Sequence, residues 1–166
     1  PAVGAGITSG IIANQAATRV GGLAGGVLGA NARVGEVSKP SFVFRGDGRT
    51  PEEIFGQGFT ATGTNLSVIN HTTSNSNSGL ISTSTSPNVA REFADMQVGG
   101  YVYTIRIPTG SVNVNQALGA KSPYPAELEV VVPGKIDAAN IVGARQVDSS
   151  GKFTGPFVQN PVYKKP

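Results

Sequence analysis

Two glutamates, Glu127 and Glu129, are the strongest candidates for chemistry in this sequence. They stand at the start of an apolar run, residues 130–132, that a Pro-Gly pair ends. Alternate side chains of a β-strand point to the same face, so both carboxylates should project together if this stretch is extended. Like charges that close must be solvated or partnered. The pair is therefore either the acidic outer face of a strand or part of a catalytic site.

An arginine far upstream is a candidate phosphate ligand. Arg45 ends a β-prone run that begins at Ser41, and the Gly-Asp-Gly-Arg that follows indicates a turn. Thr50, Pro51 and Glu53 then have the spacing of a capping box that opens a short helix. A guanidinium at the mouth of a strand-to-helix turn can bind phosphate through its planar fork. Arg45 can equally be a surface residue at the end of a strand.

Three consecutive hydroxyl residues, Ser82, Thr83 and Ser84, lie in a predicted strand over residues 80–84. A second N-cap follows directly and predicts an amphipathic helix over residues 87–97. Rows of hydroxyls are commonly turn or edge-strand residues. Only their context can give them a functional meaning.

The chain has one histidine, His71, at the edge of a polar segment over residues 72–78. We expect this segment to be a mobile surface loop, because Ser, Thr and Asn cannot drive burial. A lone histidine is more often a hydrogen-bonded structural residue than a catalyst. His71 is thus a candidate that needs other support.

The elements that must position these residues are short. The chain has 166 residues with 39% hydrophobic content, 23 Gly and 11 Pro, which favours one core of short strands with few helices. Without cysteine and with one histidine, disulfides are excluded and a conventional zinc site is not expected. The net charge of +3 provides no basic stripe, so no specific nucleic-acid partner is expected.

The two ends of the chain differ from its middle. Residues 1–35 are rich in Gly and Ala, and we predict a flexible leader there. Glycines four residues apart are also typical of a membrane-active segment, which is the alternative. The ordered domain is expected over residues 36–155, followed by a loosely ordered tail over residues 156–166. A chain that begins at Pro1 is expected to be part of a larger protein.

The candidate residues, taken in chain order, resemble a known pattern. An arginine after a first strand, a Ser-Thr-Ser on a middle strand and a Glu-x-Glu on a late strand are similar to the Arg/Ser/Glu motif of mono-ADP-ribosyltransferase toxins. The matching segments resemble the enzymatic subunits of cholera and heat-labile enterotoxins and, more distantly, of pertussis toxin; they comprise residues 44–54, 79–84, 101–103 and 112–136. The resemblance runs from about Phe42 to Val147. It implies an α+β ADP-ribosyltransferase fold, with two small packed antiparallel or mixed sheets and a few short helices around an NAD cleft.

The resemblance also implies roles for the candidate residues. Glu129 would accept a hydrogen bond from the ribose 2′-hydroxyl and stabilise the cationic transition state. Glu127 would orient and deprotonate the incoming nucleophile. Arg45 would bind NAD, and Ser82 would hold Glu129 in place.

Four more residues receive supporting roles from the same comparison of motifs. Thr83 and Ser84 would support the strand beside the NAD site. Asp47 would steady the site from its place two residues after the arginine. His71 lies where the cholera and pertussis enzymes have an active-site histidine.

The function that the resemblance implies is an NAD-dependent mono-ADP-ribosyltransferase toxin or effector. NAD would be its substrate, no metal would be needed, and ADP-ribose would pass to a target protein. Glu127 favours arginine as the acceptor, because glutamate at the first position of the pair accompanies arginine modification in this superfamily. The chain would be secreted or delivered by a bacterial toxin system and act in the target-cell cytoplasm. An NAD glycohydrolase and a catalytically inactive binding module are the alternatives.

Overall fold

The fold comes from a computed structural model, which describes residues 41–96 and 99–166. The predicted leader over residues 1–35, with its membrane-active alternative, lies outside the described residues, and so does the last residue of the helix expected over residues 87–97. No helix of the described part is long and apolar enough to span a bilayer.

Two antiparallel sheets of unequal size form the framework. The larger has seven strands in the order β5-β6-β3-β1-β4-β8-β9, and the smaller pairs β2 with β7. The strands are β1 (Phe42–Asp47), β2 (Phe59–Thr60), β3 (Leu80–Ser84), β4 (Tyr101–Arg106), β5 (Val112–Asn113), β6 (Glu129–Pro133), β7 (Lys135–Ile136), β8 (Ile141–Val147) and β9 (Phe153–Gln159). The helices are α1 (Pro51–Gln57), α2 (Val68–Thr73), α3 (Pro87–Asp95) and α4 (Val114–Leu118). The α+β class with few short helices, expected from the sequence, is confirmed.

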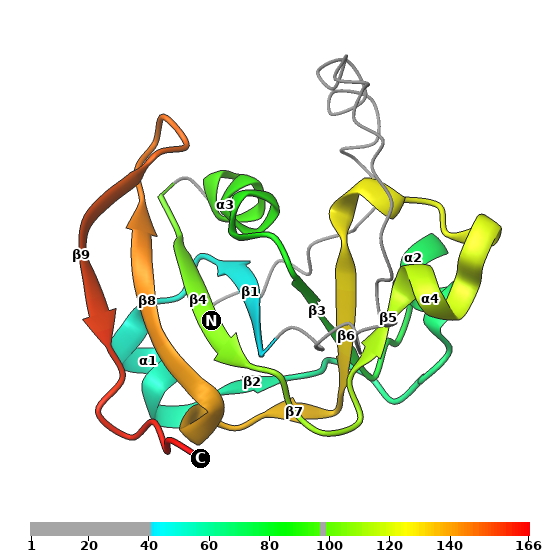
Figure 1. Cartoon of the computed structure of the whole chain (residues 1–166), viewed down its shortest axis with the longest axis horizontal. Coiled ribbons are helices and arrows are strands. Elements are labelled where there is room, and N and C mark those ends of the chain that lie inside the picture. The colour runs from blue at the N-terminus through cyan, green and yellow to red at the C-terminus, as the bar shows by residue number, and fades with distance from the viewer. Residues whose placement is uncertain (1–40, 97–98) are drawn as a thin grey trace, which may run out of the picture.

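The large sheet is divided where β1 meets β3. These strands share a single registered pair, Phe44 with Ser84, whereas β1 is paired with β4 along its whole length. Figure 1 shows β3, β6 and β5 on one side of this division and β4, β8 and β9 on the other. The division leaves backbone groups of β3 open to side chains.

Alternating side chains of β1 and β4 build two cores on opposite faces of the sheet. Val43 and Tyr103 face the core that β2, β7 and α1 cover. Phe44 and Val102 face the smaller core under α3. Figure 1 accordingly shows α3 and the β2–β7 pair on opposite sides of β1.

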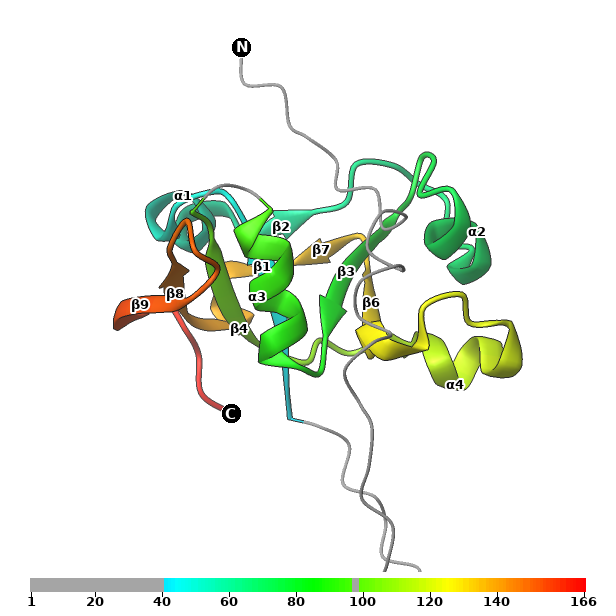
Figure 2. The same ribbon diagram turned by 90° about the horizontal axis from the view of Figure 1, so that it is seen from above.

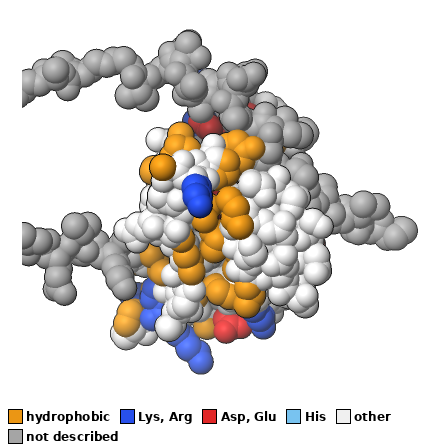
Figure 3. Space-filling model, turned by 90° about the vertical axis from the view of Figure 1, so that its right-hand side faces the viewer, with side chains coloured by type: hydrophobic (Ala, Val, Ile, Leu, Met, Phe, Trp, Pro, Cys, Tyr) orange, Lys and Arg blue, Asp and Glu red, His pale blue; other side chains and the backbone are white. Residues whose placement is uncertain are grey.

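Helices α2 and α4 lie side by side at one end of the molecule (Figure 2). Each begins at a side-chain N-cap, Ser67 for α2 and Asn113 for α4. A small cluster of Leu80, Val114 and Val131 is buried at this end. Hydrophobic side chains form a band on the surface of this end (Figure 3), and the exposed Leu66 lies beside α2.

The polar segment over residues 72–78 is exposed at residues 73, 74, 76 and 77, as a surface loop would be, but its two ends are buried. Thr72 lies in the last turn of α2 and is buried, and Ser78 is buried as well. The Ser67 hydroxyl accepts a hydrogen bond from the Asn70 N–H at 3.3 Å and caps the helix. Short polar side chains thus satisfy the backbone of a one-turn helix, which hydrophobic periodicity does not reveal.

Residues 156–166, for which we expected a loosely ordered tail, contact the domain at several points. Strand β9 continues to Gln159 and pairs with β8. Asn160 is buried, and its Nδ2 donates hydrogen bonds to the carbonyls of Ala138 and Ile141, both at 2.8 Å. The Lys164 N–H also donates to the carbonyl of Ala139 at 3.0 Å.

Candidate active site

The two glutamates of the Glu-x-Glu pair occupy different kinds of backbone. Glu127 ends a 3₁₀ turn over Pro125–Glu127, and Glu129 is the first residue of β6. Between them Leu128 is left-handed, with φ 49° and ψ 41°. The prediction that one extended strand carries both carboxylates on the same face is therefore wrong. The left-handed residue breaks the period-two alternation on which that prediction rested.

Strand β3 holds the backbone around this pair. Ser84 lies opposite Glu129 in the β3–β6 register, and the Ser84 hydroxyl donates a hydrogen bond to the Glu127 carbonyl at 2.7 Å. The Thr83 hydroxyl donates to the Val130 carbonyl at 2.5 Å. Both hydroxyls therefore hold the backbone of the turn from Glu127 into β6.

His71 connects the serine of β3 to the glutamate of β6. Its Nε2 lies 2.8 Å from the Ser82 Oγ and 3.2 Å from the Glu129 Oε1. The imidazole side chain is 2% exposed and that of Glu129 is 7% exposed. Ser82 and Glu129 thus share a contact with one nitrogen of His71. The Nδ1 atom of His71 lies 2.6 Å from the Ser78 Oγ.

Arg45 spans the division in the large sheet. Its Nη1 donates a hydrogen bond to the Ser82 carbonyl at 2.8 Å, on the part of β3 that β1 does not pair. Burial lowers the pKa of the guanidinium, and the nearby Asp47 charge offsets part of this effect. The Arg45 Nε is buried without a hydrogen-bond partner among the described residues. An unpaired buried donor is costly, so this group is suited to an anionic ligand.

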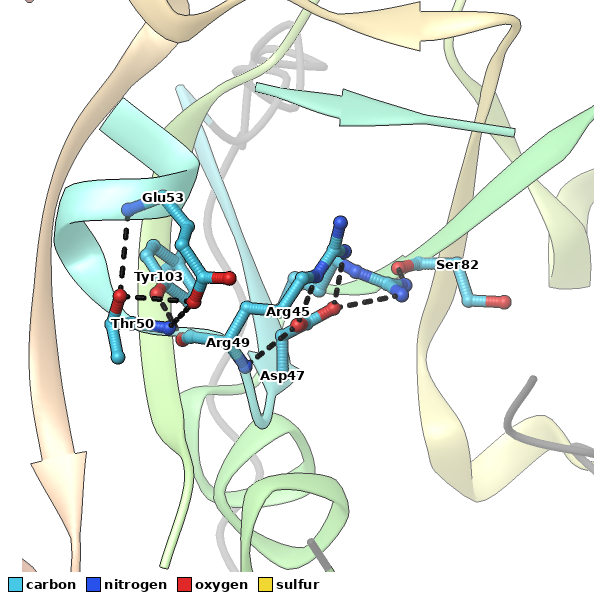
Figure 4. A network of polar contacts seen from close by, with 7 residues as sticks. All are labelled: Arg45, Asp47, Arg49, Thr50, Glu53, Ser82 and Tyr103. Atoms are coloured by element: carbon cyan, nitrogen blue, oxygen red, sulfur yellow. Dashed lines mark hydrogen bonds and ion pairs between the residues drawn. The ribbon is translucent and has the colours of Figure 1, made fainter. Parts of the chain in front are cut away.

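Asp47 links Arg45 to a second arginine that our sequence analysis did not select. The Asp47 Oδ2 lies 3.3 Å from the Arg45 Nη2, and both carboxylate oxygens accept hydrogen bonds from the Arg49 side chain at 2.8 Å (Figure 4). Burial raises the pKa of Asp47, but hydrogen bonds from Arg49 and the charge of Arg45 outweigh it and hold the pKa below its usual value. Asp47 therefore forms ion pairs with both cations.

The backbone of Arg49 is held by the elements around it. The buried Tyr103 hydroxyl of β4 donates to the Arg49 carbonyl at 2.6 Å (Figure 4). The next residue, Thr50, is the N-cap of α1, and its predicted capping box with Glu53 is confirmed. In the sequence, Arg49 was marked only by its place in the matching segment over residues 44–54.

An aromatic ring lies beneath the two arginines. The guanidinium carbon of Arg45 lies 5.2 Å from the Phe59 ring centroid, and that of Arg49 lies 5.3 Å from it. Phe59 is 1% exposed. Cation–π attraction to a buried ring restricts where the two charges can move.

Two hollows meet at Arg45 and Ser82. The first hollow is lined by Phe93, Glu127 and Glu129 in addition to residues of β1 and β3. The second hollow is lined by Arg49 and His71 together with the segment after α1. Arg45 and Ser82 line both. An extended ligand can therefore place anionic groups near the arginines and a reacting atom near the glutamates.

Glu127 is half-buried beside Glu129, and burial is the larger cause of its altered acidity. Burial and then the charge of Glu129 raise the pKa of Glu127 to about 7. A carboxylate with that pKa is a better base near neutral pH than an ordinary glutamate. Among the described residues, no three His, Asp or Glu side chains are grouped so that they could hold a metal ion.

Comparison with known proteins is consistent with this geometry. A family model described as Scabin-like matches residues 43–163. The A chain of heat-labile enterotoxin IIB from Escherichia coli is 30% identical over 143 residues, which cover 74% of this chain and 54% of that protein. Pertussis toxin subunit 1 from Bordetella pertussis is 35% identical over 107 residues, which cover 51% and 38%. The chain thus spans about half or less of the length of these curated relatives.

Solved structures agree with the family match. The Scabin toxin of Streptomyces scabies in complex with NADH aligns with a TM-score of 0.67 and 26% identity, covering 75% of this chain and 76% of Scabin. A guanine-specific ADP-ribosyltransferase aligns with a TM-score of 0.69 and 26% identity, covering 76% and 80%. Since the family model spans most of the chain and the fold matches solved members, the chain belongs to the Scabin-like family of ADP-ribosyltransferases.

Proposed function

We propose that this chain transfers ADP-ribose from NAD to an acceptor and releases nicotinamide. The observation that carries the proposal is the meeting of Arg45, His71 and Glu129 around Ser82, between two adjoining hollows. The complex of Scabin with NADH supports a nicotinamide dinucleotide as the ligand.

NAD fits the distribution of charge in the site. Arg45 and Arg49 are suited to the pyrophosphate, because guanidinium forks match phosphate oxygens. Glu129 borders the first hollow, which is also lined by Phe93 and Glu127. The ribose next to nicotinamide would lie within reach of Glu129 there. The nicotinamide–ribose bond would break with its electron pair going to nicotinamide. The positive charge left on the ribose carbon would be stabilised by the Glu129 carboxylate.

The acceptor nitrogen would then form the new bond to the ribose carbon and lose a proton to Glu127. We propose arginine as that acceptor. A guanidinium holds its proton very tightly, and the raised pKa of Glu127 makes it a stronger base than an ordinary glutamate. In this superfamily glutamate at the position of Glu127 accompanies arginine modification, as the resemblance implies.

A guanine base is the second candidate acceptor. The similarity to a guanine-specific ADP-ribosyltransferase favours it. An analysis of the products distinguishes the two acceptors, because each would give a different covalent adduct with ADP-ribose.

In the test, the purified chain is incubated with NAD and one of two acceptors. One acceptor is an arginine-containing peptide and the other is guanosine. Nicotinamide and the two ADP-ribosylated products are quantified by mass spectrometry. Glu129→Gln should lower nicotinamide release by at least about a hundredfold, the effect of removing a main electrostatic contact to the transition state. Glu127→Gln should lower transfer by about a hundredfold or more while retaining part of the NAD hydrolysis. Glu92→Gln, an exposed glutamate on α3, is the control and should behave as wild type.

Each outcome identifies a different function. Nicotinamide release without a labelled acceptor would support an NAD glycohydrolase. Absence of both NAD turnover and NAD binding would leave an inactive binding module. Full activity in Glu129→Gln would contradict the assignment of this site.

We further propose that the chain acts as the catalytic part of a bacterial toxin delivered into a target cell. Its relatives support this, because they are named as an A chain and as a subunit of toxins. The target protein would be met in the cytoplasm of that cell. A cell-delivery assay that follows arginine ADP-ribosylation of cytoplasmic proteins tests this setting.

A further inference from the structure

A buried serine lies on the side of His71 that faces away from the glutamate. Ser78 is 4% exposed, and its Oγ lies 2.6 Å from the His71 Nδ1. Its backbone is held by a bridge to Asn65 and by a hydrogen bond from the Gly63 N–H to its carbonyl at 2.8 Å. Its hydroxyl therefore has a fixed position relative to the imidazole.

The partners of Ser78 determine where its hydroxyl proton points. The Leu80 N–H donates a hydrogen bond to the Ser78 Oγ at 3.1 Å, which uses that oxygen as an acceptor. The hydroxyl proton can then go to the His71 Nδ1 at 2.6 Å or to the Leu80 carbonyl at 3.5 Å. The first contact is within the usual range of an O–H donor bond and the second is longer than that range.

The partners on the opposite side of the ring agree with this direction. Nε2 lies 2.8 Å from the Ser82 Oγ and 3.2 Å from the Glu129 Oε1. An ionised Glu129 carboxylate only accepts hydrogen bonds, so its contact requires a proton on Nε2, and the Ser82 hydroxyl oxygen can accept from the same proton. If Nε2 carries the single proton of a neutral imidazole, Nδ1 must be the acceptor. A hydroxyl donor at Ser78 supplies what that acceptor needs.

We propose that Ser78 is a positioning residue that holds His71 in the neutral form with its proton on Nε2. This inference rests on the proposed function for its catalytic consequence, but not for the state of the imidazole. In that state His71 orients Glu129 by a hydrogen bond without adding a positive charge beside it. An imidazolium in the same place would compete with the cationic ribose for the Glu129 carboxylate.

The state of the ring can be measured directly, because His71 is the only histidine of the chain. Two-bond ¹H–¹⁵N correlation spectra of the ¹⁵N-labelled protein at neutral pH distinguish a protonated ring nitrogen from an unprotonated one. The wild type should show one protonated nitrogen, Nε2, and one acceptor, Nδ1. In Ser78→Ala the imidazole should no longer be held in the single form protonated on Nε2. Ser78→Thr keeps a hydroxyl and should retain that form. Ser76→Ala, on the exposed part of the same segment, is the matched control.

Activity gives a second readout that general loosening of the structure would not produce. Ser78→Ala should lower kcat for NAD hydrolysis by about tenfold, the worth of one hydrogen bond, with little change in the KM for NAD. Ser78→Thr should restore most of that loss, and Ser76→Ala should match wild type. Circular dichroism checks that each variant is folded.

The inference is overturned if wild-type His71 carries its proton on Nδ1 or on both nitrogens, or if Ser78→Ala leaves the imidazole state and kcat unchanged. A chain without NAD turnover would instead contradict the proposed function. The spectra would still decide the role of Ser78 in that case.

Discussion

Glu127 and Glu129 are separated by one residue, yet their surroundings divide the chemistry between them. Glu129 begins β6, is buried and contacts His71. Glu127 sits on a turn that the Ser84 hydroxyl holds, half-buried beside the first hollow. The left-handed Leu128 makes this difference possible, since it turns the chain between the two carboxylates. Under the proposed function, Glu129 acts on the ribose and Glu127 on the acceptor.

The acidity of Glu127 predicts how transfer depends on pH. A base must be ionised, so transfer to arginine should rise as pH increases through about 7, the pKa of this carboxyl. Initial rates of arginine modification between pH 5.5 and 8.5 measure this rise. In Glu127→Gln the rise should be absent, and a wild-type profile centred near the usual pKa of glutamate would contradict the role of burial.

The same pKa predicts an opposite effect on stability. Because the folded-state pKa of Glu127 is raised above its unfolded value, the folded chain binds this proton more tightly. The contribution to stability is fully present below the unfolded pKa and is lost as pH rises through about 7. Catalysis and stability therefore favour different protonation states of one residue.

Strand β1 and helix α3 approach each other closely next to the site. A Cβ placed on Gly46 would collide with the Ala90 carbonyl and the Ala94 nitrogen, both in the backbone of α3. Backbone atoms cannot rotate away as side chains can. The glycine between Arg45 and Asp47 thus allows α3 to pack against the strand that carries both residues.

Gly46→Ala should therefore lower the free energy of unfolding by about 1–3 kcal/mol or more, the range for overpacked sites. Chemical denaturation measures this change. The matched control is Gly56→Ala, because a Cβ on Gly56 of α1 meets no atom within 4 Å. That variant should be as stable as wild type or more stable by about 0.5–1 kcal/mol, since alanine favours helix. Equal stability of the two variants would contradict the packing argument.

The C-terminal segment adds the last strand to the large sheet and is attached at the start of β8. Strand β9 is the last strand of the large sheet, and Asn160 follows it directly. The Asn160 side chain joins the carbonyls of Ala138 and Ile141, one in a 3₁₀ turn and one at the start of β8. One side chain thus anchors the end of β9 to backbone that lies 19 and 22 residues earlier in the chain.

Asn160→Ala should lower the free energy of unfolding by about 1–3 kcal/mol, because it leaves buried carbonyls without donors. The activity at a temperature well below the unfolding midpoint should be unchanged, since Asn160 lines neither hollow. Thermal denaturation and NAD turnover measured on the same samples test both statements. Gln159→Ala, at an exposed neighbouring position, is the control.

Features that depend on neighbouring residues were predictable. The capping box of Thr50 and Glu53 and the Ser86 N-cap of α3 follow from side chains a few positions apart, and the structure confirms both. The short helices α2 and α4 were missed, because one or two turns leave too little periodicity to detect. Leu128 also carries no local signal for its left-handed conformation, so the break between the two glutamates was not foreseen.

The order of arginine, serine and glutamate along the chain was sufficient to identify the family and to select Arg45, Ser82 and Glu129. The contacts among them were decided by tertiary structure, because they join residues far apart in sequence. Arg45 reaches the Ser82 carbonyl only where β1 and β3 separate, and His71 meets Glu129 across 58 positions of the chain. Hydrogen-bond direction and burial depend on such distant neighbours, which is why the roles of Ser78 and Arg49 emerge only from the folded chain.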